Sequence, residues 1–211
     1  MSASREPVFK APWPAMALTL AILAAFAFQR WLAPPQLLEA FAYRQGDLAT
    51  GRWVNLFTAL FLHQGWAHVL MNAAGALAFG APVSRMLGTG GRGAIAYFLL
   101  FLLCGALANF GFGELHEQAL LIGASGGVSA LFGGAARGMA GQGVRPGPLL
   151  TRPVIAMSAA WIGVNVLVGV VGFAPGAGDA LVAWEAHVMG FLAGLFLIDL
   201  FFWAAQGGKA R

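Results

Sequence analysis

The chain has 211 residues, of which 59% are hydrophobic and 9% are charged, and it carries a formal net charge of +4. A soluble domain has about 25% charged residues, so this composition excludes an ordinary soluble fold and indicates a protein that lies in a lipid bilayer. The one cysteine, Cys104, excludes an internal disulfide and is expected to be a small buried hydrophobic residue. We predict an all-α polytopic membrane protein with a single domain over residues 1–211.

Six charge-poor stretches are long enough to cross the roughly 30 Å of bilayer hydrocarbon as helices. They are predicted at about 13–33, 58–80, 94–112, 119–140, 153–173 and 181–204. The first follows basic residues and contains Ala25-Phe26-Ala27, which resembles a signal-peptide cleavage site. Its apolar run is too long for a signal peptide, so we interpret it as a retained span.

The basic residues are unevenly distributed between the predicted loops. If the amino terminus is cytoplasmic and the spans alternate, nine basic residues face the cytoplasm and three face outward. This bias follows the positive-inside rule, so the charge indicates topology and does not indicate nucleic-acid binding. With a composition rich in alanine, glycine and arginine, it favours a bacterial inner membrane with both termini cytoplasmic. The inward set is Arg5, Lys10, Arg85, Arg92, Arg137, Arg145, Arg152, Lys209 and Arg211; the outward set is Arg30, Arg44 and Arg52.

Two outer loops have contrasting compositions. The first, from about 33 to 57, is apolar and contains Pro34-Pro35, and the tryptophans at 31 and 53 suit a segment lying in the membrane interface. The loop between the fifth and sixth spans, "GFAPGAGDA", is rich in glycine, proline and alanine, so we expect it to be mobile.

Few polar residues lie inside the predicted spans, and such residues mark a functional site by default. Those of the second, fourth and sixth spans all fall in the outer half of the membrane, as expected of a cavity open to the outside. Asn165 in the fifth span is expected to form an interhelical hydrogen bond. The set is His63, His68 and Asn72 in the second span, Ser125 in the fourth, Asn165 in the fifth and His187 in the sixth.

Spacing separates the histidines of the second span. His68 and Asn72 are four residues apart and share one helix face. His63 is five residues before His68, which on a helix turns it about 140° away, so we expect His63 to support a loop.

Small residues favour close contact between the fourth and sixth spans. Gly190 and Gly194 lie on the same face as His187, and Gly126 gives the fourth span a smooth face beside Ser125. Small residues of this kind let helix backbones approach closely. If the two faces meet, His187 can reach the Ser125 hydroxyl.

The pattern Gly123-Ala124-Ser125-Gly126 has two interpretations. The serine is either a small residue in a packing face or a nucleophile, which needs a base such as His187 to take its proton. The Ser125 N–H at the start of a helix, with donors from His68 and Asn72, would then stabilise an oxyanion. No carboxylate is placed to orient the histidine, because Glu185 points elsewhere and Asp199, three turns deeper, is expected to cap or pair near the cytoplasmic interface. The pattern predicts a Ser–His dyad.

A metal site formed by His63, His68 and His187 is the main chemical alternative. No His-Glu-x-x-His pattern and no cluster of cysteines or acids accompanies these residues. We therefore predict no metal and no cofactor.

Three motifs together resemble the rhomboid family of intramembrane serine proteases. They are "HQGWAHVLMN", "GASGGVSALFG" and "AHVMGFLAG", in family order, and the resemblance covers about 52–199, within a core of about 52–204. It implies Ser125 as nucleophile, His187 as base, an oxyanion hole of His68, Asn72 and the Ser125 backbone, and supporting roles for His63, Gly123, Gly126, Gly190 and Gly194.

The resemblance further implies a six-helix rhomboid-like bundle, a first loop partly embedded in the membrane and a loop between the fifth and sixth spans that caps the site. Substrates would be single-span membrane proteins, cut near the outer face of their helix at a small residue. The alternative is an inactive relative that binds or escorts membrane helices. One departure is Ser129, where many bacterial members have a tyrosine that stacks on the base, so the base is held less firmly here or by another aromatic residue.

Overall fold

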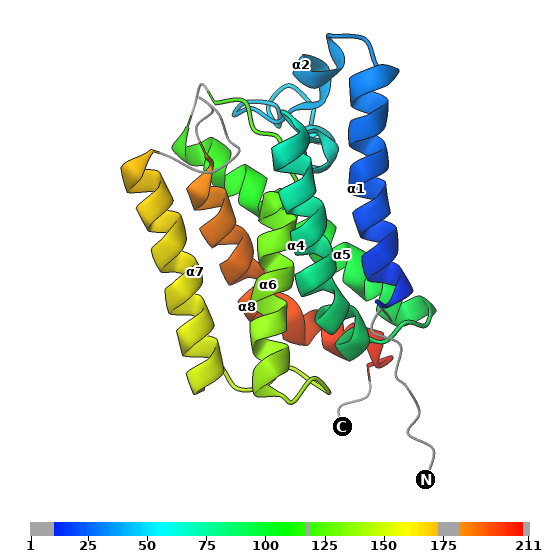
Figure 1. Ribbon diagram of the computed structural model, residues 1–211, viewed down its shortest axis with the longest axis vertical. Helices are drawn as coiled ribbons and strands as arrows, with labels where there is room; N and C mark the ends of the chain where they lie inside the picture. The colour runs from blue at the N-terminus through cyan, green and yellow to red at the C-terminus, as the bar shows by residue number, and fades with distance from the viewer. Residues whose placement is uncertain (1–10, 117–118, 173–181, 209–211) are drawn as a thin grey trace.

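The computed structural model describes residues 11–116, 119–172 and 182–208, and these residues form an all-helical fold (Figure 1). Long helices connected by short turns make up most of it, as the composition predicts. The elements are α1 (Trp13–Trp31), α2 (Leu37–Phe41), α3 (Asn55–Thr58), a 3-10 helix η1 (Ala59–Phe61), α4 (Trp66–Leu87), α5 (Gly91–Leu115), α6 (Ser125–Ala140), α7 (Arg152–Val171) and α8 (Trp184–Ala205).

Five described helices are long and apolar enough to cross a membrane, namely α1, α4, α5, α7 and α8. The prediction of a sixth such helix over 119–140 is wrong in its bounds, because α6 has only 16 residues and begins at Ser125. The preceding residues are extended: Leu121 exchanges two backbone hydrogen bonds with Tyr43, and the Gly123 N–H donates to the Ala59 carbonyl. Gly123 has φ +120°, which ends any helix that would run through this segment.

The predicted second span, 58–80, also differs from the structure. Residues 58–61 belong to α3 and η1, and α4 begins only at Trp66. The Gln29 side chain explains the late start, because its amide bonds both the N–H and the carbonyl of His63, at 3.0 and 2.7 Å. The N–H and the carbonyl of His63 are therefore already hydrogen-bonded, so the chain does not need to be helical at this residue. At its other end α4 continues past Pro82 and stops at Gly88, where φ is +92°.

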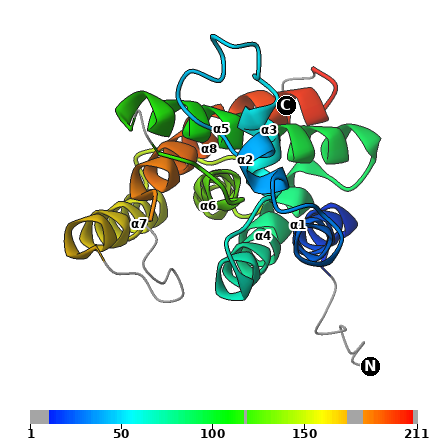
Figure 2. The ribbon, with the colours of Figure 1, turned by 90° about the horizontal axis from the view of Figure 1, so that it is seen from above.

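The short helix α6 occupies the centre of the bundle (Figure 2). It contacts α4, α5, α7 and α8, while α1 packs mainly on α4. Glycine and alanine make up most of its buried positions. A Cβ at Gly127 would lie 2.6 Å from the ring of Phe101 on α5, so the small residues allow the neighbouring helices to surround α6 closely.

The first loop is folded around buried polar groups. Asp47 is 1% exposed, forms an ion pair with Arg52 at 2.6 Å and accepts a hydrogen bond from Asn55 at 3.0 Å. Tyr43, also in this loop, packs against α5 at Gly113, and burial raises the pKa of the Tyr43 hydroxyl. The loop is therefore a rigid support for the extended segment 119–124 that Tyr43 pairs with.

The described arginines form two groups, which lie at opposite ends of the bundle. Arg30 lies in the last turn of α1 and Arg44 and Arg52 lie in the loop beyond it, at the upper end of the molecule in Figure 1. The opposite end carries Arg85, Arg92, Arg145 and Arg152. Arg5, Lys10, Lys209 and Arg211 lie outside the described residues, as does most of the loop predicted to cap the site.

Candidate active site

Ser125 is the first residue of α6, at the point where the extended segment turns into the central helix. Its backbone N–H has no acceptor inside the helix, because the first N–H groups of a helix never do. The turn requires glycine at position 123 for two reasons. The φ of +120° suits only glycine, and a Cβ there would lie 2.6 Å from His68 Nε2.

His68 and Asn72 of α4 both approach the same backbone point. A Cβ at Gly123 would lie 2.6 Å from His68 Nε2 and 3.7 Å from Asn72 Nδ2. Asn72 is 5% exposed, and its Nδ2 is buried without a hydrogen-bond partner among the described residues. Leaving a buried donor unpaired costs about 1–3 kcal/mol. The side chains of His68 and Asn72 therefore converge on Gly123, two residues before Ser125, and the Nδ2 of Asn72 is a donor without an acceptor among the described residues.

His63 lies beside this pair but not on α4. Its Nε2 accepts a long hydrogen bond, 3.5 Å, from the N–H of Ala124, and its ring meets the His68 ring edge-on with centroids 5.0 Å apart. The helical argument for His63 was wrong, because the residue precedes the helix and no rotation per residue applies to it. Its contact is nevertheless with the loop backbone that leads to Ser125. The role of Gln29 in holding His63 was missed, since nothing in the sequence connects an α1 glutamine with this turn.

Close backbone contact between α6 and α8 places His187 near the level of Ser125. A Cβ at Gly190 would overlap the carbonyl oxygen of Gly126, and one at Gly194 would overlap the carbonyl oxygen of Ala130. The two glycine faces therefore meet directly. His187 is one turn before Gly190, and Ser125 immediately precedes Gly126, so the histidine lies at the level of the serine. His68 on α4 also lies within electrostatic range of His187.

His187 has a hydrogen-bond partner on α7. Its Nδ1 lies 2.7 Å from Asn165 Oδ1, and Asn165 Nδ2 donates to the Trp161 carbonyl at 2.9 Å. The predicted interhelical hydrogen bond of Asn165 is confirmed, but its partner was not foreseen. Ser129 is 1% exposed, and the aromatic ring contacts found among the described residues do not include His187. An amide, not an aromatic ring, holds this histidine.

The acidic residues of α8 are engaged away from His187. Glu185 pairs with His116 at the end of α5, with Oε1 3.0 Å from Nε2. Asp199 pairs with Arg137 of α6 at 2.7 Å, as expected for a residue near the inner end of the helix. Neither carboxylate orients the base. No group of three or more histidine, cysteine or acidic residues suited to a metal ion occurs in the described parts of the chain.

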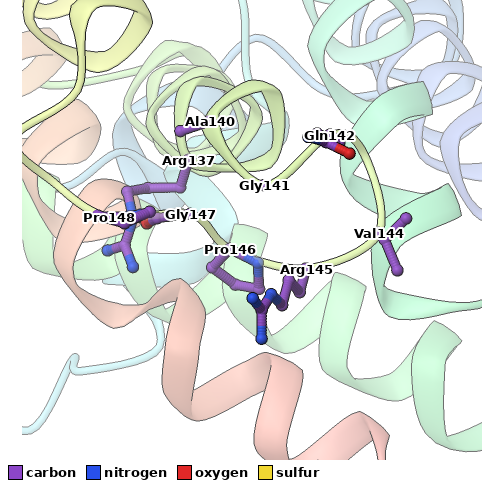
Figure 3. A pocket seen from close by; sticks show the side chains of 9 residues that line it. All are labelled: Arg137, Ala140, Gly141, Gln142, Val144, Arg145, Pro146, Gly147 and Pro148. Carbon is purple, nitrogen blue, oxygen red and sulfur yellow. The ribbon is translucent and has the colours of Figure 1, made fainter.

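One cavity lies at the opposite end of α6 from Ser125. It has a volume of about 540 Å³ and is formed by the turn between α6 and α7 (Figure 3). Arg137 donates there to the carbonyls of Leu195 and Gly147 as well as to Asp199, so its guanidinium group joins the turn to α8. A second cavity, of about 270 Å³, lies between the end of α1 and Gln64. The residues that line the cavity in Figure 3 are Arg137, Ala140, Gly141, Gln142, Val144, Arg145, Pro146, Gly147 and Pro148.

The fold is that of a multi-pass helical membrane protein with a serine at the start of its central helix and a histidine on the adjacent helix α8. A family model described as the Rhomboid domain matches residues 50–204. The match covers most of the chain, so the chain belongs to the rhomboid family.

One curated relative adds to this assignment. The "Putative rhomboid protease YdcA" of Bacillus subtilis (strain 168) is 31% identical over 87 residues, which are 41% of this chain and 41% of the relative. The matched region thus spans less than half of either protein.

Proposed function

We propose that this rhomboid-family protein is an intramembrane serine endopeptidase that cleaves single-span membrane proteins near the outer face of their transmembrane segment. The observation that carries the proposal is the convergence of His68 and the buried Nδ2 of Asn72 on Gly123, two residues before Ser125, together with the bond that holds His187 at its Nδ1. Donors gathered at the start of a helix suit the stabilisation of an oxyanion.

The chemistry follows from the positions of these groups. Ser125 Oγ attacks the scissile carbonyl carbon while His187 Nε2 takes the hydroxyl proton. The oxyanion of the tetrahedral intermediate accepts hydrogen bonds from the Ser125 N–H, Asn72 Nδ2 and His68. Collapse breaks the C–N bond, and His187 returns the proton to the leaving amine. Water activated by His187 then hydrolyses the acyl-enzyme, so neither metal nor cofactor takes part.

The length of α6 supports a site below the membrane surface. Sixteen residues span about 24 Å, less than the roughly 30 Å of hydrocarbon, so α6 is a sixth, shortened span. We place its inner end at the interface, where Arg137 and Arg145 lie. Ser125 is then recessed on the outer side, under the extended segment 119–124. A substrate helix must unwind to reach it, which favours small residues and unstable helix ends.

The distribution of charged and aromatic residues supports the orientation. The arginine-rich end that contains Arg85, Arg92, Arg145 and Arg152 is cytoplasmic, and both termini lie on that side of the bacterial inner membrane. Trp31 and Trp53, which are 67% and 62% exposed, anchor the first loop in the outer interface.

The decisive experiment compares the wild type with Ser125→Ala and His187→Ala in membranes that contain a tagged single-span substrate with small residues near its outer end. A serine-directed fluorophosphonate probe is applied to the same samples. Cleavage or probe labelling by the wild type, lost in both variants, is the expected result. A folded wild type that binds the substrate helix, but neither cleaves it nor reacts with the probe, would overturn the proposal in favour of an inactive protein that escorts membrane helices.

A further inference from the structure

One face of α7 carries all of its described close contacts with the rest of the bundle. Trp161, Asn165 and Gly169 are four residues apart and therefore lie in one stripe. The Trp161 ring packs against Phe132 of α6, with centroids 5.0 Å apart, and Gly169 lies against the Trp184 indole of α8. Only Val154 and Asn165 are buried on this helix. The one polar side chain of the stripe therefore lies where α7 meets the base.

The hydrogen bonds of Asn165 fix which way its amide points. Nδ2 donates to the Trp161 carbonyl, so Oδ1 faces His187. The reversed amide would place two oxygens, neither carrying a hydrogen, 2.9 Å apart. An amide oxygen can only accept, so Nδ1 of His187 must carry a hydrogen.

The consequence concerns the tautomer of the histidine. A neutral imidazole carries one hydrogen, and a hydrogen at Nδ1 leaves Nε2 with its lone pair free. That lone pair is what a base needs to take the Ser125 proton. In the Ser-His-Asp arrangement a carboxylate does this, but here the carboxylates of Glu185 and Asp199 are engaged with His116 and Arg137.

We infer that Asn165 is a positioning residue that holds His187 in the Nδ1–H tautomer with Nε2 directed to Ser125, replacing both an orienting carboxylate and the ring that is missing at Ser129. The inference rests on the proposed protease function. Asn165 acts through the base and does not touch the substrate. The proposal therefore extends the Ser–His pair to a third member on a separate helix.

The test uses three variants in the full-length protein. Asn165→Leu removes the acceptor at nearly constant volume, Asn165→Asp keeps an oxygen acceptor, and Val154→Ala weakens the packing of α7 without approaching His187. In metal sites, loss of the hydrogen-bond partner that orients a histidine costs about 10- to 100-fold, and we take the same range for His187. We expect Asn165→Leu to lower kcat by that factor with little change in KM, and Val154→Ala to leave kcat near the wild-type value.

Asn165→Asp distinguishes positioning from simple packing. A carboxylate beside Nδ1 stabilises the imidazolium ion, so activity should be largely retained, with the acid limb of the pH–rate profile moved to higher pH. If Asn165→Leu keeps full activity, or if it loses no more than Val154→Ala, the inference is wrong.

A spectroscopic readout separates this inference from the proposed function. Nitrogen-15 NMR of imidazole-labelled protein, with the His187→Ala spectrum used for assignment, should show His187 as the Nδ1–H tautomer in the wild type and a shift towards the Nε2–H tautomer in Asn165→Leu. The Nε2–H tautomer in the wild type would overturn the inference. A correct tautomer with neither substrate cleavage nor probe labelling of Ser125 would overturn the protease function and leave the Asn165 contact standing.

Discussion

At the scale of single residues, the buried amide of Asn72 is a group whose contribution to activity and to stability can be separated. Nearly all buried polar groups in proteins have partners, yet the Nδ2 of Asn72 has none among the described residues. The oxyanion of the proposed reaction would be its partner.

We therefore expect Asn72→Leu to lower the activity without lowering the thermal stability. Removal of an oxyanion donor lowers kcat by about 10²–10³-fold, while removal of an unpaired buried donor should not lower the thermal unfolding midpoint. Substrate cleavage and thermal unfolding of the same preparations check both parts. If the midpoint falls together with the activity, Asn72 has a structural role and the interpretation is wrong.

The candidate site residues could be selected from the sequence because polar residues are rare in the spans, but their contacts could not. His63 is held by Gln29 from 34 positions away, and such a bond leaves no periodic pattern. Asn165 was expected to bond between helices, and only the structure identifies His187 as its partner. Both cases depend on tertiary packing, which a single helical pattern does not encode.

At the scale of elements, the contact between α6 and α8 determines how closely the helices that carry Ser125 and His187 approach each other. Carbonyl oxygens of α6 occupy the places where Cβ atoms of Gly190 and Gly194 would be. The small-residue spacing predicts this closeness well. The start of α6 was predicted poorly, because the apolar run before Ser125 has the composition of a helix but pairs with the first loop.

Gly190→Ala should separate the two helices. The added methyl group meets the backbone of Gly126, which cannot move as a side chain would, and overpacking of this kind costs about 1–3 kcal/mol. We expect a lower unfolding midpoint and at least a tenfold slower reaction of Ser125 with the probe.

Gly163→Ala on α7 is the matched control, because nothing lies within 4 Å of the added Cβ. It should leave both the midpoint and the labelling rate unchanged. Equal effects of the two substitutions would mean that close α6–α8 contact is not what places His187.

At the scale of the whole molecule, the all-helical fold and the separation of charges could be predicted from the sequence, since both follow from composition and loop position. The structure places the two sets of described arginines at opposite ends. The positive-inside rule predicts that the end with Arg85, Arg92, Arg145 and Arg152 faces the cytoplasm. This orientation can be tested.

Single introduced cysteines can map that orientation without removing the native one. Cys104 is fully buried and should react little with a membrane-impermeant maleimide. In intact cells we expect labelling of Leu48→Cys in the first loop and no labelling of Val144→Cys, which is 73% exposed at the other end. Disruption of the membrane should expose the second site. Labelling of Val144→Cys alone in intact cells would reverse the topology.

The narrow stripe of contacts on α7 would make the lipid a component of the proposed catalytic geometry. Most of this helix is exposed to its surroundings, and only 11% of its most apolar window is buried inside the protein. In a bilayer we therefore expect the lateral pressure of the acyl chains to help keep Asn165 against His187. Solubilisation changes that pressure and loosens the hold on the base, so rates measured in micelles and in bilayers describe differently constrained forms of the same site.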